Sequence, residues 1–163
     1  MDVHRAAEEG DVSEVERCLD SGVDVNNRDS SGDTALYAAS WHNQPAVVKC
    51  LVQRGADTEV RGDTGKTPLI VAAIKNHTSV IQELLTGGAQ VNVQIINGES
   101  ALSWAAYKGY KESVERLLQA QADPNLCGTN GWTPFHWSGK YFCVAKSLTL
   151  LVTTGALLLV FQN

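Results

Sequence analysis

The stretch Gly65-Lys66-Thr67-Pro68-Leu69-Ile70-Val71-Ala72-Ala73 decides the fold, because three other parts of the chain repeat it. Each copy begins with glycine and any residue, followed by Thr or Ser, then Ala or Pro, then Leu or Phe. The other copies begin at Gly32, Gly98 and Gly131, so that consecutive copies are 33 residues apart. A fixed period of this length predicts a repeat architecture, in which each unit packs against its neighbours.

The local chemistry of one copy predicts two short helices and a turn. The Thr67 hydroxyl can cap a helix that begins at Pro68, where the missing N–H is not needed. The pair Ala72-Ala73 lets this helix lie close to the next unit. A second helix is predicted over the apolar residues of 80–85, and Gly88 can end it with a left-handed backbone. Helices this short are unstable alone, so the units must stack to bury their apolar faces.

The pattern resembles the ankyrin repeat, which runs roughly G-x-T-P-L-H-x-A-A, then V-V-x-L-L, then G-A-D-V-N. The resemblance implies an all-α fold, a solenoid of stacked helix-turn-helix units with projecting β-hairpin fingers, such as residues 61–64 and 125–130. We expect residues 1–163 to form a single ankyrin-repeat domain. Its expected units span about 1–31, 32–64, 65–97, 98–130 and 131–163, and the last is degenerate.

Several residues depart from the repeat pattern. Gln121 stands where earlier units have a glycine, and Thr58-Glu59 and Gln90 depart from the finger phrase. The segment 148–161 is strongly apolar, but its 14 residues are fewer than the roughly 20 that span a membrane. A chain cut short in mid-array, an alternative carboxy terminus and a partner-binding surface all stay open for this segment. Peripheral membrane contact through it is an alternative that we do not favour.

Charge and cysteine usage bound the partners and the compartment. The chain has a formal net charge of −5, and residues 1–31 contain nine acids against three bases. This acidity argues against nucleic acid as a partner, because phosphate-binding domains usually carry excess positive charge. The polar amino terminus shows no signal peptide, and the four cysteines have no metal-ligand spacing. We therefore expect a cytoplasmic protein with reduced thiols, with the nucleus as the alternative.

The sequence shows no grouping of residues for catalysis. Gly65-Lys66-Thr67 resembles the end of a phosphate-binding loop, but Val60 stands where that loop needs its first glycine. The four histidines are far apart, and none pairs with a serine, cysteine or acid in a recognisable pattern. We expect no enzymatic activity, no cofactor, no metal and no small-molecule substrate.

The ankyrin resemblance implies that partner contacts come from the concave ends of the first helices and from the finger tips. At the helix ends, the candidate partner-binding residues are Trp41, His42, Ile74, Lys75, Tyr107, Lys108, Lys140 and Tyr141. On the fingers, the candidates are Asp33, Lys66, Glu99 and Trp132. Large apolar side chains repeated at one exposed position favour a binding stripe. The alternative is that Trp41 and Tyr107 tuck partly beneath the next finger, and Trp104 is expected to pack between units.

These observations predict a protein–protein interaction module, an adaptor or scaffold that binds a partner protein through its concave surface and finger tips. The partner's identity cannot be deduced from the repeat pattern, because one fold hosts many functions. The alternative is the amino-terminal targeting or regulatory fragment, or a short isoform, of a larger ankyrin-repeat enzyme or channel.

Overall fold

The computed structural model describes residues 2–129, 131, 133 and 134, which form eight α-helices. The chain divides into two compact units, Met1–Gln90 and Val91–Asn163. The first unit contains α1 (Val3–Glu9), α2 (Val12–Asp20), α3 (Ala35–Trp41), α4 (Pro45–Gln53), α5 (Pro68–Lys75) and α6 (Thr78–Thr86). The described part of the second unit contains α7 (Ala101–Lys108) and α8 (Lys111–Gln119). The expected degenerate repeat, 131–163, falls almost wholly outside the described residues.

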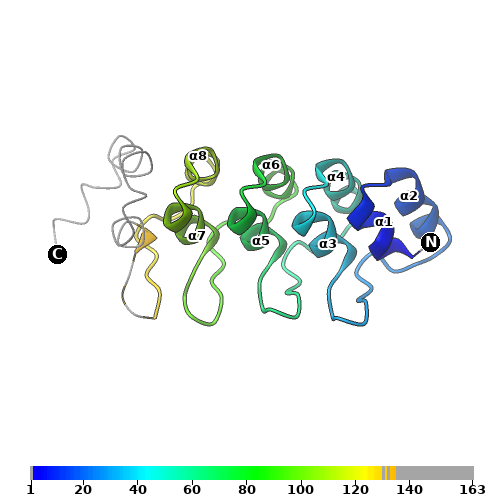
Figure 1. Ribbon diagram of the computed structural model, residues 1–163, viewed down its shortest axis with the longest axis horizontal. Helices are drawn as coiled ribbons and strands as arrows, with labels where there is room; N and C mark the ends of the chain where they lie inside the picture. The colour runs from blue at the N-terminus through cyan, green and yellow to red at the C-terminus, as the bar shows by residue number, and fades with distance from the viewer. Residues whose placement is uncertain (1, 130, 132, 135–163) are drawn as a thin grey trace. The chain divides into compact units, whose positions relative to one another are not determined.

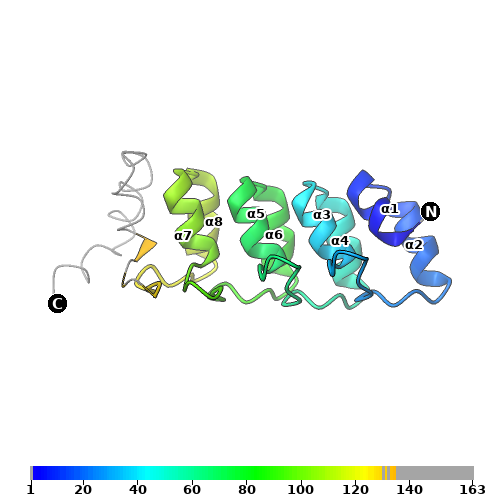
Figure 2. The ribbon, with the colours of Figure 1, turned by 60° about the horizontal axis from the view of Figure 1, so that its bottom comes forward.

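Helices within the unit Met1–Gln90 pack in two rows. Figure 1 shows α1, α3 and α5 in one row and α2, α4 and α6 in the other. The two helices of each repeat lie against each other, as α3 and α4 do in Figure 2. Leu36, Leu51, Leu69 and Leu84 are completely enclosed between the rows. The stacked helical architecture predicted from the 33-residue period is therefore confirmed.

The first helix is capped by a hydroxyl in the three repeats that contain α3, α5 and α7, whereas Asp2, which precedes α1, makes no side-chain cap hydrogen bond. The side chains of Thr34, Thr67 and Ser100 accept hydrogen bonds from the backbone N–H groups three residues later, at 3.2, 3.4 and 3.2 Å. Pro68 is the first residue of α5, as the Thr-Pro pair predicts. The cap satisfies an N–H group that would otherwise have no partner within the helix, and it fixes where the helix begins.

The turn after each second helix has a left-handed backbone. Gly22, Gly55 and Gly88 have φ values of +96°, +85° and +88°. Gln121 occupies the corresponding place after α8 and has φ +65° despite its side chain. The prediction of left-handed residues at these positions is confirmed, and the fold imposes the conformation on Gln121 as well.

The fingers are narrow loops that extend beyond the helix ends (Figure 1). Antiparallel bridges join Arg28 to Thr34 and Gln94 to Ser100, and among the described residues these bridges are isolated. In the finger between them, the Gly62 N–H donates to the Lys66 carbonyl oxygen at 3.0 Å. The described fingers therefore project as short loops rather than as extended strands: the finger at 61–64 is closed by this backbone bond without a bridge, and residue 130 of the expected finger at 125–130 lies outside the described residues.

One side-chain hydrogen bond recurs between consecutive finger phrases. The Asn26 Oδ1 accepts from the Asp57 N–H, and the Asn92 Oδ1 accepts from the Asp123 N–H, both at 2.8 Å. Glu59 stands at the matching position between them, and its carboxylate accepts from the Gln90 N–H at 2.9 Å. Glu59 departs from the family phrase in residue type but makes the same contact.

None of the helices in the described ranges is long and apolar enough to cross a membrane. The apolar segment 148–161 lies outside those ranges.

Candidate protein-interaction surface

The candidate partner-binding residues lie at the carboxy-terminal ends of the first helices and on the fingers. Trp41, His42, Lys75 and Lys108 are exposed. The partly exposed candidates are Asp33, Lys66, Ile74, Glu99 and Tyr107. Trp132, Lys140 and Tyr141 fall outside the described residues.

A concave hollow of about 260 Å³ lies within the unit Met1–Gln90. It is formed where the ends of α1 and α3 meet the fingers that precede α3 and α5. We call it the acidic hollow, because four carboxylates line it together with two aromatic rings: Glu8, Asp29, Asp33, Asp63, Tyr37 and Trp41. The hollow brings together Trp41 and Asp33, which the sequence assigned separately to a helix end and a finger; His42 also lines it.

The two aromatic rings of the acidic hollow belong to one helix. Tyr37 and Trp41 stand four residues apart on α3, and their rings stack with centroids 6.4 Å apart and planes inclined by 26°. Tyr37 is only 4% exposed, and its hydroxyl shares a 3.0 Å hydrogen bond with the Thr64 hydroxyl on the next finger. Trp41 is 40% exposed. The buried tyrosine therefore supports a tryptophan that faces solvent.

A cation already lies on the Trp41 ring. The Lys75 Nζ, from the following repeat, is 3.9 Å from the ring centroid. An ammonium group is attracted to the electron-rich face of an aromatic ring, and tryptophan is the best of the natural rings for this contact. The Trp41 ring thus remains exposed, and its contact with the next repeat comes from helix α5 rather than from a finger.

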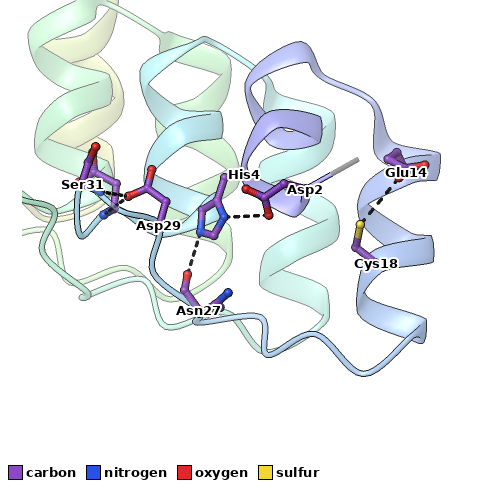
Figure 3. Close-up of polar contacts among 8 residues, drawn as sticks. Asp2, His4, Glu14, Cys18, Asn27, Asp29 and Ser31 are labelled. Atoms are coloured by element: carbon purple, nitrogen blue, oxygen red, sulfur yellow. Dashed lines mark hydrogen bonds and ion pairs between the residues drawn. The ribbon is translucent and has the colours of Figure 1, made fainter.

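Two of the four carboxylates of the acidic hollow, those of Asp29 and Asp33, are positioned by the finger backbone. The Asp29 Oδ1 accepts from the Ser31 N–H at 2.8 Å (Figure 3), and it also accepts from the Asp33 N–H at 3.0 Å. The Asp33 Oδ1 accepts from the Asp63 N–H of the next finger at 3.0 Å. Each of these bonds uses one carboxylate oxygen and fixes the direction of the other, so the acids are held in place.

Burial raises the pKa of the Tyr37 hydroxyl, and the negative charges of Asp33 and Asp63 raise it further. The hydrogen bond to Thr64 acts in the opposite direction. The pKa direction is consistent with a negative potential at the base of the hollow, since nearby negative charge opposes the ionisation of a phenol.

The unit Val91–Asn163 contains a smaller hollow, of about 130 Å³, lined by Glu99, Ser103, Trp104 and Tyr107. The Trp104 and Tyr107 rings meet edge to face with centroids 5.8 Å apart. The Lys108 Nζ lies 5.5 Å from the Tyr107 centroid. Trp104 is partly exposed and its ring contacts Tyr107, because residues three apart on a helix share one face. The repeat that follows lies almost wholly outside the described residues, so the expected packing of Trp104 between units stays a prediction.

Tyr37 and Trp104 are aromatic residues of these hollows that were not among the predicted partner-binding residues, and neither were the acids Glu8, Asp29 and Asp63. Both aromatic residues stand three or four residues before a selected aromatic residue, at Trp41 and Tyr107. That spacing on a predicted helix is a signal for side-chain contact. The signal was available in the sequence, but the repeat position assigned Trp104 to the interior and gave Tyr37 no role.

His4 makes contacts of a structural kind. Its Nε2 donates to the Asn27 carbonyl oxygen at 3.0 Å, and its Nδ1 lies 3.3 Å from the Asp2 carboxylate (Figure 3). The first bond ties α1 to the chain that leads into the first finger. In the part of the chain that is described, no group of three or more His, Cys, Asp or Glu side chains is placed to hold a metal ion.

Comparison with protein families agrees with this geometry. The family profile described as ankyrin repeats (3 copies) matches residues 3–95, which is more than half of the chain. The chain belongs to the ankyrin repeat family. A second ankyrin profile, described as ankyrin repeats (many copies), matches residues 102–138.

One protein similar to this chain is named as an ankyrin repeat protein, YahD of Escherichia coli (strain K12). It is 45% identical to this chain over 47 residues, which is 29% of this chain and 23% of YahD. The match therefore spans less than a quarter of the relative. Ankyrin repeats are in general protein–protein interaction modules and are typically not enzymes. The helix ends and fingers described above are thus candidate contact surfaces for a protein.

Proposed function

We propose that this ankyrin-repeat chain is an adaptor that binds a partner protein through the ends of its first helices and its finger tips. The observation that carries the proposal is the exposed Trp41 ring, supported from below by Tyr37 and surrounded by finger carboxylates. A large aromatic side chain held rigidly at the surface has the character of an interface hot spot, because it loses little conformational entropy when it is buried.

The repeat architecture supports recognition by a rigid surface. The carboxylates of Asp29 and Asp33 are fixed by backbone N–H groups, and Tyr37 is tied to the following finger through Thr64. Binding to side chains already held in place costs less ordering than binding to a mobile loop. We place this function in the cytoplasm, with the nucleus as the alternative, and we propose a single domain over residues 1–163.

Photo-crosslinking from defined positions tests the proposal. A photoreactive amino acid replaces His42 or Lys108 on the proposed surface, one in each compact unit. In the control chains it replaces Lys49 or Gln119, which are exposed residues of the second helices α4 and α8. We expect the same partner protein to be crosslinked in cells from His42 and Lys108 and not from the control positions. Equal labelling from both sets, or labelling from Lys49 and Gln119 alone, would refute the proposed surface.

A further inference from the structure

We infer that the acidic hollow receives an arginine side chain from a basic segment of the partner protein. The inference rests on the proposed function and narrows the partner class. It joins three features of one place in the structure: the size of the hollow, its charge, and an aromatic ring that already carries a cation.

The size of the hollow suits a single side chain. Sites for drug-sized ligands usually enclose about 300–1,000 Å³. The acidic hollow measures about 260 Å³, and Trp41 in its lining is 40% exposed to solvent. A long side chain that enters from an extended segment matches this space better than a whole small molecule does.

The charge of the hollow selects a cation. Glu8, Asp29, Asp33 and Asp63 line it, and neither lysine nor arginine is among the described residues of its lining. Arg5, Arg17 and Arg54 of this unit form ion pairs with other carboxylates, those of Glu9, Glu14 and Asp20. The surrounding part of the chain is also acidic: residues 1–31, which include Glu8 and Asp29, contain nine acids and three bases. A positively charged group of the partner would complement these four acids.

The aromatic component favours arginine over lysine. The guanidinium group is planar, so that it can stack on an indole ring while its N–H groups donate to carboxylates at its edge. The acidic hollow offers both partners, the Trp41 ring and the finger carboxylates. An ammonium group is a compact, strongly hydrated charge that cannot form the same fork of hydrogen bonds.

Lys75 is an internal competitor for the same ring. Its Nζ lies 3.9 Å from the Trp41 centroid, so the ring is known to accept a cation in this fold. An arriving arginine must share the ring with Lys75 or displace it. This competition predicts the direction in which affinity changes. Removing the Lys75 charge should strengthen the binding of an arginine, and it should weaken the binding of an acidic group.

Fluorescence anisotropy with the complete chain tests the inference. The probe is a labelled peptide, Gly-Ser-Arg-Gly-Arg-Ser-Gly, and the comparator contains citrulline in place of each arginine, which keeps the shape but removes the charge. We expect the citrulline peptide to bind about tenfold more weakly, because it has lost the charge-assisted hydrogen bonds. A peptide with lysine in place of arginine should fall between the two.

Two matched double variants locate the site. Glu8→Gln with Asp63→Asn removes two charges from the hollow, and we expect the arginine peptide to bind it about tenfold more weakly. Glu16→Gln with Glu83→Gln changes the net charge equally at sites outside the lining. Binding should stay within about twofold of the unmodified chain, because surface charges outside the hollow are screened by salt. Lys75→Gln should tighten binding by about threefold, and Trp41→Leu should weaken it.

Three results overturn the inference: equal affinity for the arginine and citrulline peptides, an equal loss in the two double variants, or weaker binding by Lys75→Gln. Urea unfolding of each variant shows whether it is folded, and the Glu8/Asp63 pair still decides the matter if Trp41→Leu does not fold. If the arginine and citrulline peptides bind with equal affinity while crosslinks still arise from His42, the arginine inference fails and the proposed function stands. If crosslinks arise only from Lys49 and Gln119, the proposed function fails.

Discussion

At the scale of single residues, the left-handed turn after each second helix shows how strongly the fold constrains the backbone. Gly88 and Gln121 adopt positive φ at equivalent positions, although only glycine does so without steric cost. A Cβ added at Gly88 would meet no atom within 4 Å, so the penalty there comes from the backbone conformation alone. The two positions therefore form a matched pair for measuring that penalty.

We expect Gln121→Gly to raise the free energy of unfolding by about 1 kcal/mol, because it removes a left-handed non-glycine residue. Gly88→Gln should lower that free energy by about 1–2 kcal/mol for the same reason. Urea unfolding followed by circular dichroism measures both changes. An unchanged or lower stability for Gln121→Gly would contradict the strain explanation.

Tyr37 should make stability depend on alkaline pH. Burial and the nearby acids raise its pKa in the folded chain, so the unfolded chain, with a tyrosine pKa of about 10, ionises first. The stabilising contribution is complete below about pH 10 and is lost as the pH rises towards the folded pKa. We expect Tyr37→Phe to lose less stability than the unmodified chain between about pH 9.5 and 11. Thermal melts at each pH measure the stability of both proteins. An equal loss of stability for the two over this pH range would contradict the prediction.

The sequence only partly predicted which residue types can make the contact that a given repeat position requires. The left-handed glycines follow from glycine's backbone freedom, which acts locally. Glu59 breaks the Asn phrase, yet it accepts the same N–H bond as Asn26 and Asn92. Any side-chain oxygen with suitable reach satisfies that donor, and a pattern of residue types does not reveal such an equivalence.

At the scale of helices, the ends of the first helices are set by short sequence signals. Thr67 caps α5 through the Ile70 N–H, and Pro68 occupies its first position. These contacts lie within a few residues of one another, which is why the sequence alone placed the start of the helix correctly. The helix partners could be predicted as well, because the period fixes which faces meet.

Replacing the cap tests its contribution to stability. We expect Thr67→Ala to lower the free energy of unfolding by about 1 kcal/mol, since the Ile70 N–H loses its acceptor in a buried setting. Thr67→Ser keeps the hydroxyl and should recover most of this loss. Guanidinium denaturation of the three proteins measures the differences, and equal stability of the alanine and serine variants would refute a capping role.

The candidate surface was less predictable than the helices. Exposed positions such as Trp41 follow from the repeat position, but the stacking of Tyr37 and the approach of Lys75 depend on side-chain rotamers and on the neighbouring repeat. The acidic hollow needs residues from α1, α3 and two fingers at once. The sequence orders these residues along the chain, but their meeting in one concavity requires three-dimensional packing.

At the scale of the whole molecule, the uneven charge should control how fast a basic ligand arrives. The nine acids of residues 1–31 lie in the same compact unit as the acidic hollow. Their field attracts cations over about a Debye length, which is about 30 Å at 0.01 M salt and about 10 Å at 0.1 M. A basic ligand is therefore steered towards this unit at low ionic strength.

We expect the association rate of the arginine peptide to fall by about tenfold between 0.01 and 0.3 M salt, with a smaller change in its dissociation rate. Stopped-flow anisotropy measures both rates. The Glu8→Gln/Asp63→Asn chain should show a shallower salt dependence, because part of the attracting charge is absent. A salt-independent association rate would show that the acidic field does not steer the ligand.

The recurring bonds between finger phrases have a consequence for how such a chain can change in length. Asn26, Glu59 and Asn92 each accept a hydrogen bond from a backbone N–H of the next repeat, 31 residues further along the chain. Duplicating or deleting a whole 33-residue segment would leave every such pairing with an equivalent partner. Inserting a single residue between Asn26 and Asp57 would shift the two groups out of register. Gene changes that add or remove complete repeats should therefore be tolerated far more readily than short insertions within one.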